Sequence, residues 1–159
     1  QVAATDSSEA ALQVARRNAR ALGVADRVTF ACGHLCEALP AQSVSDEQRL
    51  ALIASNPPYV PTGRIEKLQP EVRDHEPRAA LDGGPDGLRV IRELVPAAAA
   101  ALRPGGWLVL ELGEDQAAPV TEIIAAAEAL APDSIETVTD GGGTQRVLAV
   151  RRRDEQEDA

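Results

Sequence analysis

The four residues Asn56-Pro57-Pro58-Tyr59 form the group whose types and spacing most clearly suggest chemistry. The two prolines have no backbone N–H and fix φ near about −65°, so this segment loses two hydrogen-bond donors. What remains is the side-chain oxygen of Asn56 and the carbonyl of Pro57, two acceptors beside the flat ring of Tyr59. A planar amide or aminopyrimidine NH2 group has two hydrogens to donate, so two acceptors select it while the Tyr59 ring packs against its flat face.

A nitrogen held in this way could attack an electrophile such as a sulfonium methyl group. Near-collinear contact between the nitrogen and the methyl carbon can supply about 7 to 11 kcal/mol through orientation. No separate acid or base is required, since the nitrogen could lose its proton late to Asn56, to the Pro57 carbonyl or to water. The alternative is an exposed proline-rich turn. The position of the group directly after the apolar run at 50–55 favours a binding role.

Asp6 is the second candidate, because it ends a β-like run over residues 1–5 and precedes a helix. An acid at the end of a strand can accept hydrogen bonds from both ribose hydroxyls, about 20 residues after a glycine-rich turn. Counting back that far passes Gln1, so this role would place the glycine-rich turn and its strand before Gln1. The alternative is that Asp6 only caps the following helix, and the residue pattern leaves both roles open.

The elements that must position these residues alternate between strands and helices. The expected order begins with strand 1–5, helix 9–22 with Ser7 and Ser8 as N-cap and Gly23 as C-cap, and strands 27–32 and 50–55. An irregular loop over 57–85 with one helical turn follows, and then helix 86–102 with a kink or break at Pro96. The last elements are tight turn 103–106, strand 107–112, helix 115–130 and a hairpin of 134–139 with 145–151. This α/β order predicts a mostly parallel sheet covered on both faces, with an antiparallel hairpin at one edge. Ligands bind beyond the carboxyl ends of such strands, so we expect Asp6 and Asn56 on one edge of the sheet.

Composition limits the classes of function. A chain of 159 residues with 44% hydrophobic content forms one globular domain. A formal charge of −9 and a single residue each of Trp, Tyr and Phe argue against nucleic acid as a partner. The sequence shows no apolar stretch long enough to span a membrane and no signal-like start, so it predicts no membrane association and a cytoplasmic protein.

Two small clusters are given structural interpretations. Cys32, His34 and Cys36 would share one face of an extended segment, but a fourth ligand is missing and Gly33 ends the strand, so we predict free thiols and no metal site. The glycines at 141–143 are followed by a strand and not by a helix, which predicts a hairpin turn and not a phosphate site.

Several longer segments carry a resemblance to a known family. They are Val2-Ala3-Ala4-Thr5-Asp6, Ser55-Asn56-Pro57-Pro58-Tyr59-Val60-Pro61, the run from Glu71 to Leu81 followed by Gly83-Gly84 and Asp86-Gly87-Leu88, Arg103-Pro104-Gly105-Gly106, Glu111-Leu112-Gly113, and Asp140 with Arg146-Val147. Together they resemble the glutamine methyltransferases that modify peptide chain release factors, within the class-I methyltransferases. The run from Glu71 is the discriminating part, because other amino methyltransferases share the Asn-Pro-Pro-Tyr tetrapeptide.

The resemblance implies methyl transfer from S-adenosylmethionine to the side-chain amide of the glutamine in the release factor's Gly-Gly-Gln loop. It implies catalytic roles for Asn56, Pro57 and Tyr59, a substrate clamp formed by the whole tetrapeptide including Pro58, and cofactor contacts from Asp6, Leu35 and Asn56. His34 stands where the family usually has an Asp, which favours a strand-end histidine without a ligand role. Arg73 and Glu76 either brace the loop around the substrate or pair on the surface.

The resemblance also implies a Rossmann-like class-I methyltransferase sheet over residues 1–151 and a disordered charged tail over 152–159. Family members carry a helical amino-terminal domain and a first strand with a glycine-rich loop, which residues 1–159 lack. We therefore expect a catalytic domain that is incomplete at its amino terminus, with the missing strand between those ending at Asp6 and Asn56. A fragment of this kind is expected to be inactive by itself.

Two other functions remain as alternatives. An adenine-amine DNA methyltransferase would use the same acceptors on a flipped base, but it would need a basic DNA-recognition segment that these residues lack. The second alternative is a catalytically inactive remnant that binds peptide through the loop at 57–85. The presence of Asp6 and Asn56 argues against it.

Overall fold

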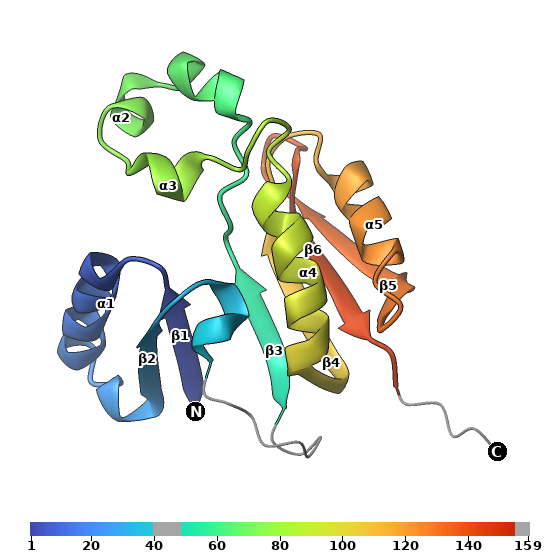
Figure 1. Ribbon diagram of the computed structural model, residues 1–159, viewed down its shortest axis with the longest axis horizontal. Helices are drawn as coiled ribbons and strands as arrows, with labels where there is room; N and C mark the ends of the chain where they lie inside the picture. The colour runs from blue at the N-terminus through green and yellow to red at the C-terminus, as the bar shows by residue number, and fades with distance from the viewer. Residues whose placement is uncertain (40–48, 155–159) are drawn as a thin grey trace. The chain divides into compact units, whose positions relative to one another are not determined.

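The protein is described by a computed structural model that covers residues 1–39 and 49–154 (Figure 1). The chain divides into two compact units, Gln1–Ser45 and Asp46–Ala159, which are described separately below. No helix among the described residues is long and apolar enough to cross a membrane.

The first unit is a β–α–β arrangement. Strand β1 (Val2–Asp6) pairs in parallel with β2 (Val28–Cys32), and α1 (Glu9–Ala21) connects them. Helix α1 buries Leu12 and Ala19, which lie seven residues apart and therefore share one face. Leu22 is the C-cap of the helix, one residue before the predicted Gly23, and Gly23 follows it with φ +67°, a left-handed conformation that glycine adopts without strain. Short 3₁₀ helices cover Ala25–Arg27 and Leu35–Ala38.

Ser8 is the N-cap of α1, as the sequence predicted. Its side-chain oxygen accepts a hydrogen bond from the Ala11 backbone N–H at 3.2 Å. We expect Ser8→Ala to lower the free energy of unfolding by about 1 kcal/mol, because one N–H of the first helical turn loses its partner. Urea unfolding followed by circular dichroism measures this, with Ser7→Ala as the control. An equal loss in both variants would contradict the assignment of the cap to Ser8.

The second unit is a four-stranded mixed sheet with the order β3-β4-β6-β5. Strand β3 (Leu50–Ser55) pairs in parallel with β4 (Leu102–Glu111), while β6 (Gln145–Arg152) is antiparallel to both β4 and β5 (Leu130–Thr139). The predicted carboxyl-terminal hairpin is therefore confirmed. Asp140 closes its turn by accepting hydrogen bonds from the backbone N–H groups of Gly142 and Thr144.

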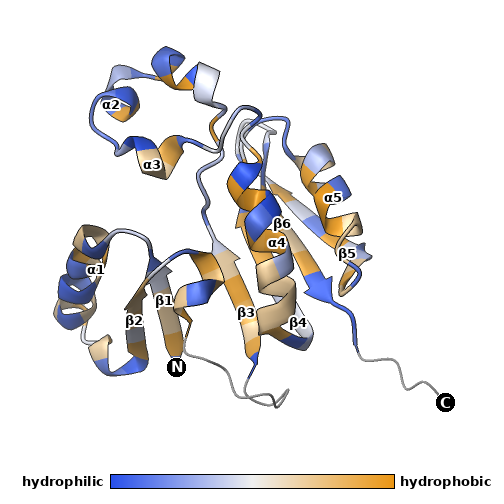
Figure 2. Cartoon of the chain, in the orientation of Figure 1, coloured by the Kyte–Doolittle hydropathy of each residue, from blue (hydrophilic) through white to orange (hydrophobic). Residues whose placement is uncertain are grey.

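The core of this unit forms where α4 (Arg89–Ala101) and α5 (Ala117–Ala125) pack on the sheet. Figure 2 shows hydrophobic and hydrophilic residues on both helices, as expected for helices with one face against a sheet. The fully buried side chains come from both helices and from three strands, and they include Ile91, Val95, Leu108, Leu110, Val120, Ile124, Leu130, Leu148 and Val150.

The connection between β3 and α4 contains more helix than the sequence predicted. The expected irregular loop with one helical turn holds three short helical segments, a 3₁₀ helix at Thr62–Lys67, α2 (Pro70–Arg73) and α3 (Arg78–Leu81). The prediction treated the prolines of this region as breakers. Pro61 and Pro77 instead precede a helical segment and Pro70 begins one, a position where the missing N–H has no helical partner to lose.

Three features in the second half of the chain also differ from prediction. Residues 103–106 do not form the predicted tight turn but lie within β4. The pairing with β3 is irregular there, because Leu50 pairs with Leu102 and Leu52 pairs with Trp107. Pro96 lies inside α4 without ending it. Helix α5 ends at Ala125, before the predicted end at residue 130, and Leu130 is instead the first residue of β5.

The predicted charged tail at 152–159 is described only in its first part. Arg152 is the last residue of β6, and the Arg153 backbone N–H donates to the Ala129 carbonyl at 2.8 Å. Residues 155–159, the rest of that predicted tail, lie outside the described residues.

Candidate active site

The tetrapeptide Asn56–Tyr59 leaves the carboxyl end of β3, as predicted. Asn56 is exposed, Pro57 is buried, and Pro58 and Tyr59 are half-buried. Within the described chain, the Asn56 side chain makes no hydrogen bond, so its amide oxygen is available to a ligand. The buried Pro57 restricts the backbone next to this side chain.

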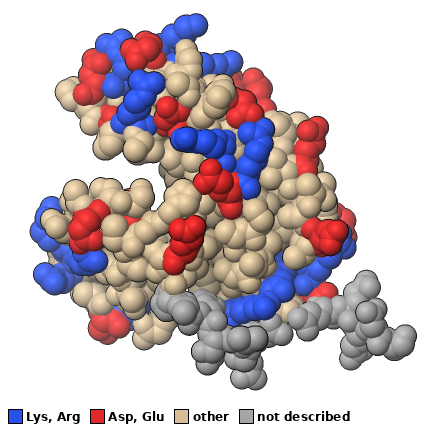
Figure 3. All heavy atoms as spheres, in the orientation of Figure 1, with Lys and Arg blue, Asp and Glu red and all other residues tan. Residues whose placement is uncertain are grey.

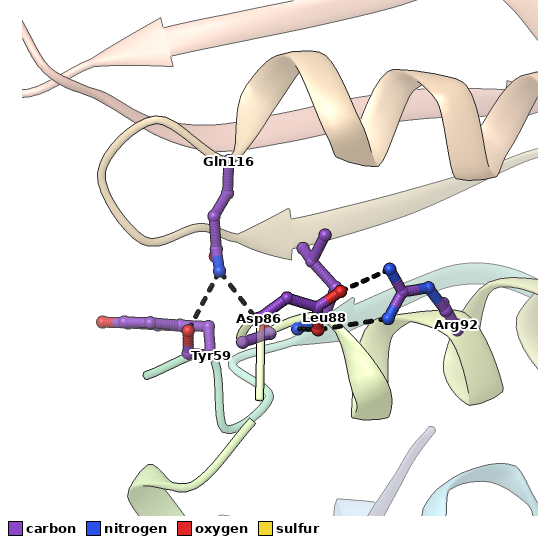
Figure 4. Close-up of polar contacts among 6 residues, drawn as sticks. Tyr59, Asp86, Leu88, Arg92 and Gln116 are labelled. Carbon is purple, nitrogen blue, oxygen red and sulfur yellow. Dashed lines mark hydrogen bonds and ion pairs between the residues drawn. The ribbon is translucent and has the colours of Figure 1, made fainter. Parts of the chain in front are cut away.

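Tyr59 is held at both of its polar ends. Its hydroxyl donates a hydrogen bond to Glu111 Oε1 at 3.0 Å, at the end of β4. Its backbone carbonyl accepts a hydrogen bond from Gln116 Nε2 at 2.9 Å (Figure 4). The ring is therefore held from both ends by groups that lie far along the chain.

The segment 81–88 supports the residue that follows Tyr59. The Val60 backbone N–H donates to the Leu81 carbonyl at 2.9 Å, and Gly83 N–H donates to the Val60 carbonyl at 2.9 Å. Asp86 joins this segment to α4, because its carboxylate accepts from the Leu88 backbone N–H at 3.1 Å and pairs with Arg92 at 2.6 Å (Figure 4). The hydrogen bonds from Arg92 and from Leu88 lower the pKa of Asp86 to about 2, so it stays ionised under ordinary conditions.

Two glycines permit close packing around Tyr59. Gly87 has φ +78°, and a Cβ at this position would overlap with the Tyr59 carbonyl oxygen. A Cβ at Gly113 would lie 3.1 Å from the Tyr59 ring carbon Cδ2. Both positions fall in segments that carried the family resemblance, and the structure gives the physical reason why a side chain does not fit there.

The environment of Tyr59 raises the pKa of its phenol. Burial is the main cause, and the hydrogen bond to Glu111 and the charge of Glu111 add to it, while the positive charge of Arg146 acts in the opposite direction. The folded-state pKa of Tyr59 lies above the usual tyrosine pKa of about 10. The protonated phenol therefore adds to the stability of the fold, and this contribution is complete below a pH of about 10. It is lost as the pH rises through the folded-state pKa.

We expect Glu111→Gln to lower the pKa of Tyr59 toward the ordinary tyrosine value, because the negative charge beside the phenol is removed. Tyr59 is the only tyrosine of the chain, so tyrosinate absorbance in an alkaline titration reports this one group. The exposed Glu122→Gln on α5 is the matched control. Equal Tyr59 titration curves for wild type and Glu111→Gln would contradict the observed hydrogen bond.

Asp6 ends β1 in the first unit, and its carboxylate is exposed. Its Oδ1 accepts a hydrogen bond from the Ser8 backbone N–H at 2.7 Å, while its backbone carbonyl accepts from Gly33 N–H at 3.0 Å. The side-chain cap of α1 comes from Ser8, so Asp6 supports the turn before the helix and does not cap the helix itself. For Oδ2 the structure shows no hydrogen bond to the described residues, which leaves this oxygen available to a ligand.

Leu35, the predicted adenine contact, has a left-handed backbone with φ +47°, which is uncommon for a large side chain. Thr5 at the end of β1 donates a hydrogen bond from its hydroxyl to the Leu35 carbonyl at 3.2 Å. Gly33 allows the turn to close, because a Cβ there would lie 2.7 Å from the Ala38 Cβ. Strained backbone of this kind is concentrated at ligand sites, which agrees with the proposed contact.

Asp6 and Leu35 belong to the first unit, while the tetrapeptide belongs to the second. Each group lies at the carboxyl end of a parallel strand in its own unit. That they share one edge of a sheet stays a prediction.

Arg73 pairs with the neighbouring Asp74, with Nε 2.7 Å from Oδ1, and not with Glu76. Both members of the pair are exposed, and such surface pairs contribute little to stability. On the face shown in Figure 3, acidic and basic side chains lie among one another, and Arg78 contacts both Glu66 and Asp82 within 4 Å.

Two residues of the site were not predicted from the sequence. Glu111 lies in the resembling segment Glu111–Gly113 but was given no role, and Gln116 was counted as part of a helix. The only signal for Gln116 is a polar residue before an apolar helical run, a pattern that more often marks an ordinary helix start.

Comparison with curated proteins finds proteins named release factor glutamine methyltransferase. The one from Geobacter sulfurreducens is 52% identical over 120 residues, which are 76% of this chain and 39% of that protein. The one from Moorella thermoacetica is 44% identical over 154 residues, which are 97% of this chain and 51% of that protein. The chain spans about half the length of such relatives. A scan against protein-family models gives no match.

Solved structures show the same fold at low sequence identity. A methyltransferase from Pyrococcus furiosus matches with a TM-score of 0.64 at 17% identity, over 96% of this chain and 63% of that one. The ribosomal protein L11 methylase from Lactobacillus delbrueckii subsp. bulgaricus matches with a TM-score of 0.60 at 16% identity, over 96% and 58%. The predicted class-I methyltransferase fold, with parallel strands and an antiparallel carboxyl-terminal hairpin, is confirmed.

Proposed function

Because this chain belongs to the family of release factor glutamine methyltransferases, we propose that it carries the active-site loop for methylation of a glutamine side-chain amide. The methyl donor in this proposal is S-adenosylmethionine, and the substrate is the glutamine in the Gly-Gly-Gln loop of a peptide chain release factor. Translation termination would place the protein in the cytoplasm.

The exposed Asn56 amide beside the buried Pro57 is the observation that carries this proposal. A glutamine amide offers two N–H groups, and the Asn56 side-chain oxygen and Pro57 carbonyl offer two acceptors at adjacent positions. Both N–H donors of the substrate would point at the loop, and the nitrogen lone pair, which is perpendicular to the amide plane, would stay open on the face opposite Tyr59. Pro58 lines the same segment without adding a competing donor.

Tyr59 would pack against the flat face of the substrate amide. Its hydroxyl is bound to Glu111 and its carbonyl to Gln116, so the ring cannot turn freely when the substrate is absent. A preorganised ring costs less ordering when the substrate binds, and the loop would thus supply orientation more than acid–base chemistry.

The donor supplies an electrophilic methyl group when it is bound. The carboxylate of Asp6 suits the two ribose hydroxyls, because it is exposed and one of its oxygens has no hydrogen bond to the described residues. The half-buried Leu35, whose carbonyl accepts a hydrogen bond from Thr5 next to Asp6, is the apolar residue that could pack on an adenine ring. Asp6 and Leu35 thus fit the adenosine portion of S-adenosylmethionine. Asn56 would contact the same molecule from the side where the substrate binds.

The test uses the full-length protein, S-adenosylmethionine and a purified release factor. Mass spectrometry of the peptide that contains Gly-Gly-Gln is expected to show the added mass of one methylene unit, located on the glutamine. Unmethylated duplex DNA with radiolabelled methyl donor serves as the second arm. Label in DNA, together with an unmodified release factor, would overturn the proposed substrate.

A further inference from the structure

We infer that Gln116 is a positioning residue, whose buried side-chain amide sets the backbone of the Asn-Pro-Pro-Tyr loop relative to the ends of β4 and α4. Among the described residues, Gln116 is the one buried residue with a polar side chain, with 7% of its surface exposed. It lies directly before α5 and points away from that helix toward Tyr59 (Figure 4).

The Gln116 amide binds three separate chain segments. Its Oε1 accepts a hydrogen bond from the Gly113 backbone N–H at 2.9 Å. Its Nε2 donates to the Tyr59 carbonyl at 2.9 Å and to the Gly87 carbonyl at 3.3 Å. Both donor hydrogens and the acceptor are used, so the amide orientation is fixed and the three backbone segments are held at set distances.

The surroundings of the amide have little room for any other arrangement. A Cβ at Gly87 would lie 2.7 Å from Gln116 Nε2, and a Cβ at Gly113 would lie 2.9 Å from Gln116 Oε1. Without the Gln116 amide, the buried Gly113 N–H and the Tyr59 and Gly87 carbonyls would lose their partners, and leaving buried polar groups unpaired is costly. Gly87, Gly113 and the Gln116 amide therefore pack against one another and depend on one another.

The Tyr59 carbonyl belongs to the same residue whose hydroxyl binds Glu111. Gln116 holds the backbone end of Tyr59, and Glu111 holds its side-chain end. A shift of the backbone moves the ring away from Glu111 and moves the Asn56 amide with it, since only two residues separate Asn56 from Tyr59. This step rests on the proposed function, because the cost of such a shift appears in methyl transfer.

Gln116→Glu is the sharpest variant, because it keeps the shape of the side chain and replaces the NH2 donor with an oxygen that faces two carbonyls. Gln116→Met is the second variant, with similar volume and neither charge nor hydrogen bond. The control is Gln145→Glu, the same change at an exposed position whose amide donates only to the Thr137 hydroxyl.

Two measurements separate positioning from a purely structural role, both made well below the unfolding temperature. In Gln116→Met, the alkaline absorbance titration of Tyr59 is expected to move toward the ordinary tyrosine value, because the ring becomes less buried and leaves Glu111. In Gln116→Glu the added carboxylate opposes this shift, so the titration is interpreted for Gln116→Met alone. The kcat for the release factor is expected to fall about 100-fold, as for a misplacement of about 1 Å, while the dissociation constant for S-adenosylmethionine stays unchanged.

Variants that are less stable but keep the wild-type kcat, with a wild-type Tyr59 titration in Gln116→Met, would overturn the inference, since Gln116 would then be a structural residue only. If neither variant folds, hydrogen exchange in the wild type decides. The side-chain NH2 protons of Gln116 should exchange far more slowly than those of Gln145, and equal rates would overturn the inference. If the wild type fails to methylate the release factor, the proposed function is wrong, and the Tyr59 titration of Gln116→Met alone tests the positioning role.

Discussion

Asn56→Ala is expected to abolish methylation of the release factor while it lowers the affinity for S-adenosylmethionine only slightly and leaves the fold unchanged. The Asn56 amide is exposed and has no hydrogen bond within the described chain, so its removal costs the folded protein little. The bound nitrogen gains positive charge as it attacks the methyl group, and its hydrogen bond to the Asn56 oxygen strengthens in the transition state. The loss should therefore appear in kcat, at about 100- to 1,000-fold for one preorganised polar group.

The measurement follows the methylated Gly-Gly-Gln peptide by mass spectrometry under steady-state conditions, in the full-length protein. The control is Asn18→Ala, at an exposed position of α1 and the only other asparagine of the chain. A variant with wild-type kcat and a raised KM would show that Asn56 contributes only to substrate binding. A variant with wild-type values of both would remove Asn56 from the site.

Local signals in the sequence predicted most of the fold correctly. Strand β3 matches its predicted range, because its apolar run ends abruptly at the Asn-Pro-Pro sequence. Helix α1 begins after Ser8 and ends before Gly23, since capping residues act through their own backbone neighbours. The carboxyl-terminal hairpin follows from two β-like runs around a glycine turn. In each case the determining interaction spans only a few residues.

Features that depend on distant contacts were missed. The residues 103–106 look like a turn, but the neighbouring strands hold them as an irregular part of β4. Leu35 has a left-handed conformation, and its carbonyl accepts a hydrogen bond from Thr5, which is 30 residues away. Proline spacing alone does not distinguish a broken loop from one in which prolines begin helical turns, as at Pro70.

The candidate site divides in the same way. The chemical groups that would face the substrate are contiguous at 56–59, so the sequence displays them together. The groups that hold them, Glu111 and Gln116, follow Tyr59 by 52 and 57 residues and contact it only through the fold. Residue types show what a site could bind, whereas the residues that hold its geometry require the tertiary structure.

Asp6→Ala is expected to weaken S-adenosylmethionine binding about ten- to a hundredfold, corresponding to about 1.5 to 3 kcal/mol for charge-assisted hydrogen bonds to two ribose hydroxyls. Asp6 also accepts the Ser8 N–H at 2.7 Å, so a loss of affinity could arise through the turn before α1. Asp6→Asn separates these roles, because its side-chain oxygen still accepts from Ser8 while the negative charge is lost. Isothermal titration calorimetry on the full-length protein should show weaker binding for both variants, with the exposed Asp26→Ala as the control. Wild-type affinity in both variants, together with a lower melting temperature for Asp6→Ala, would restrict Asp6 to its structural role in the turn.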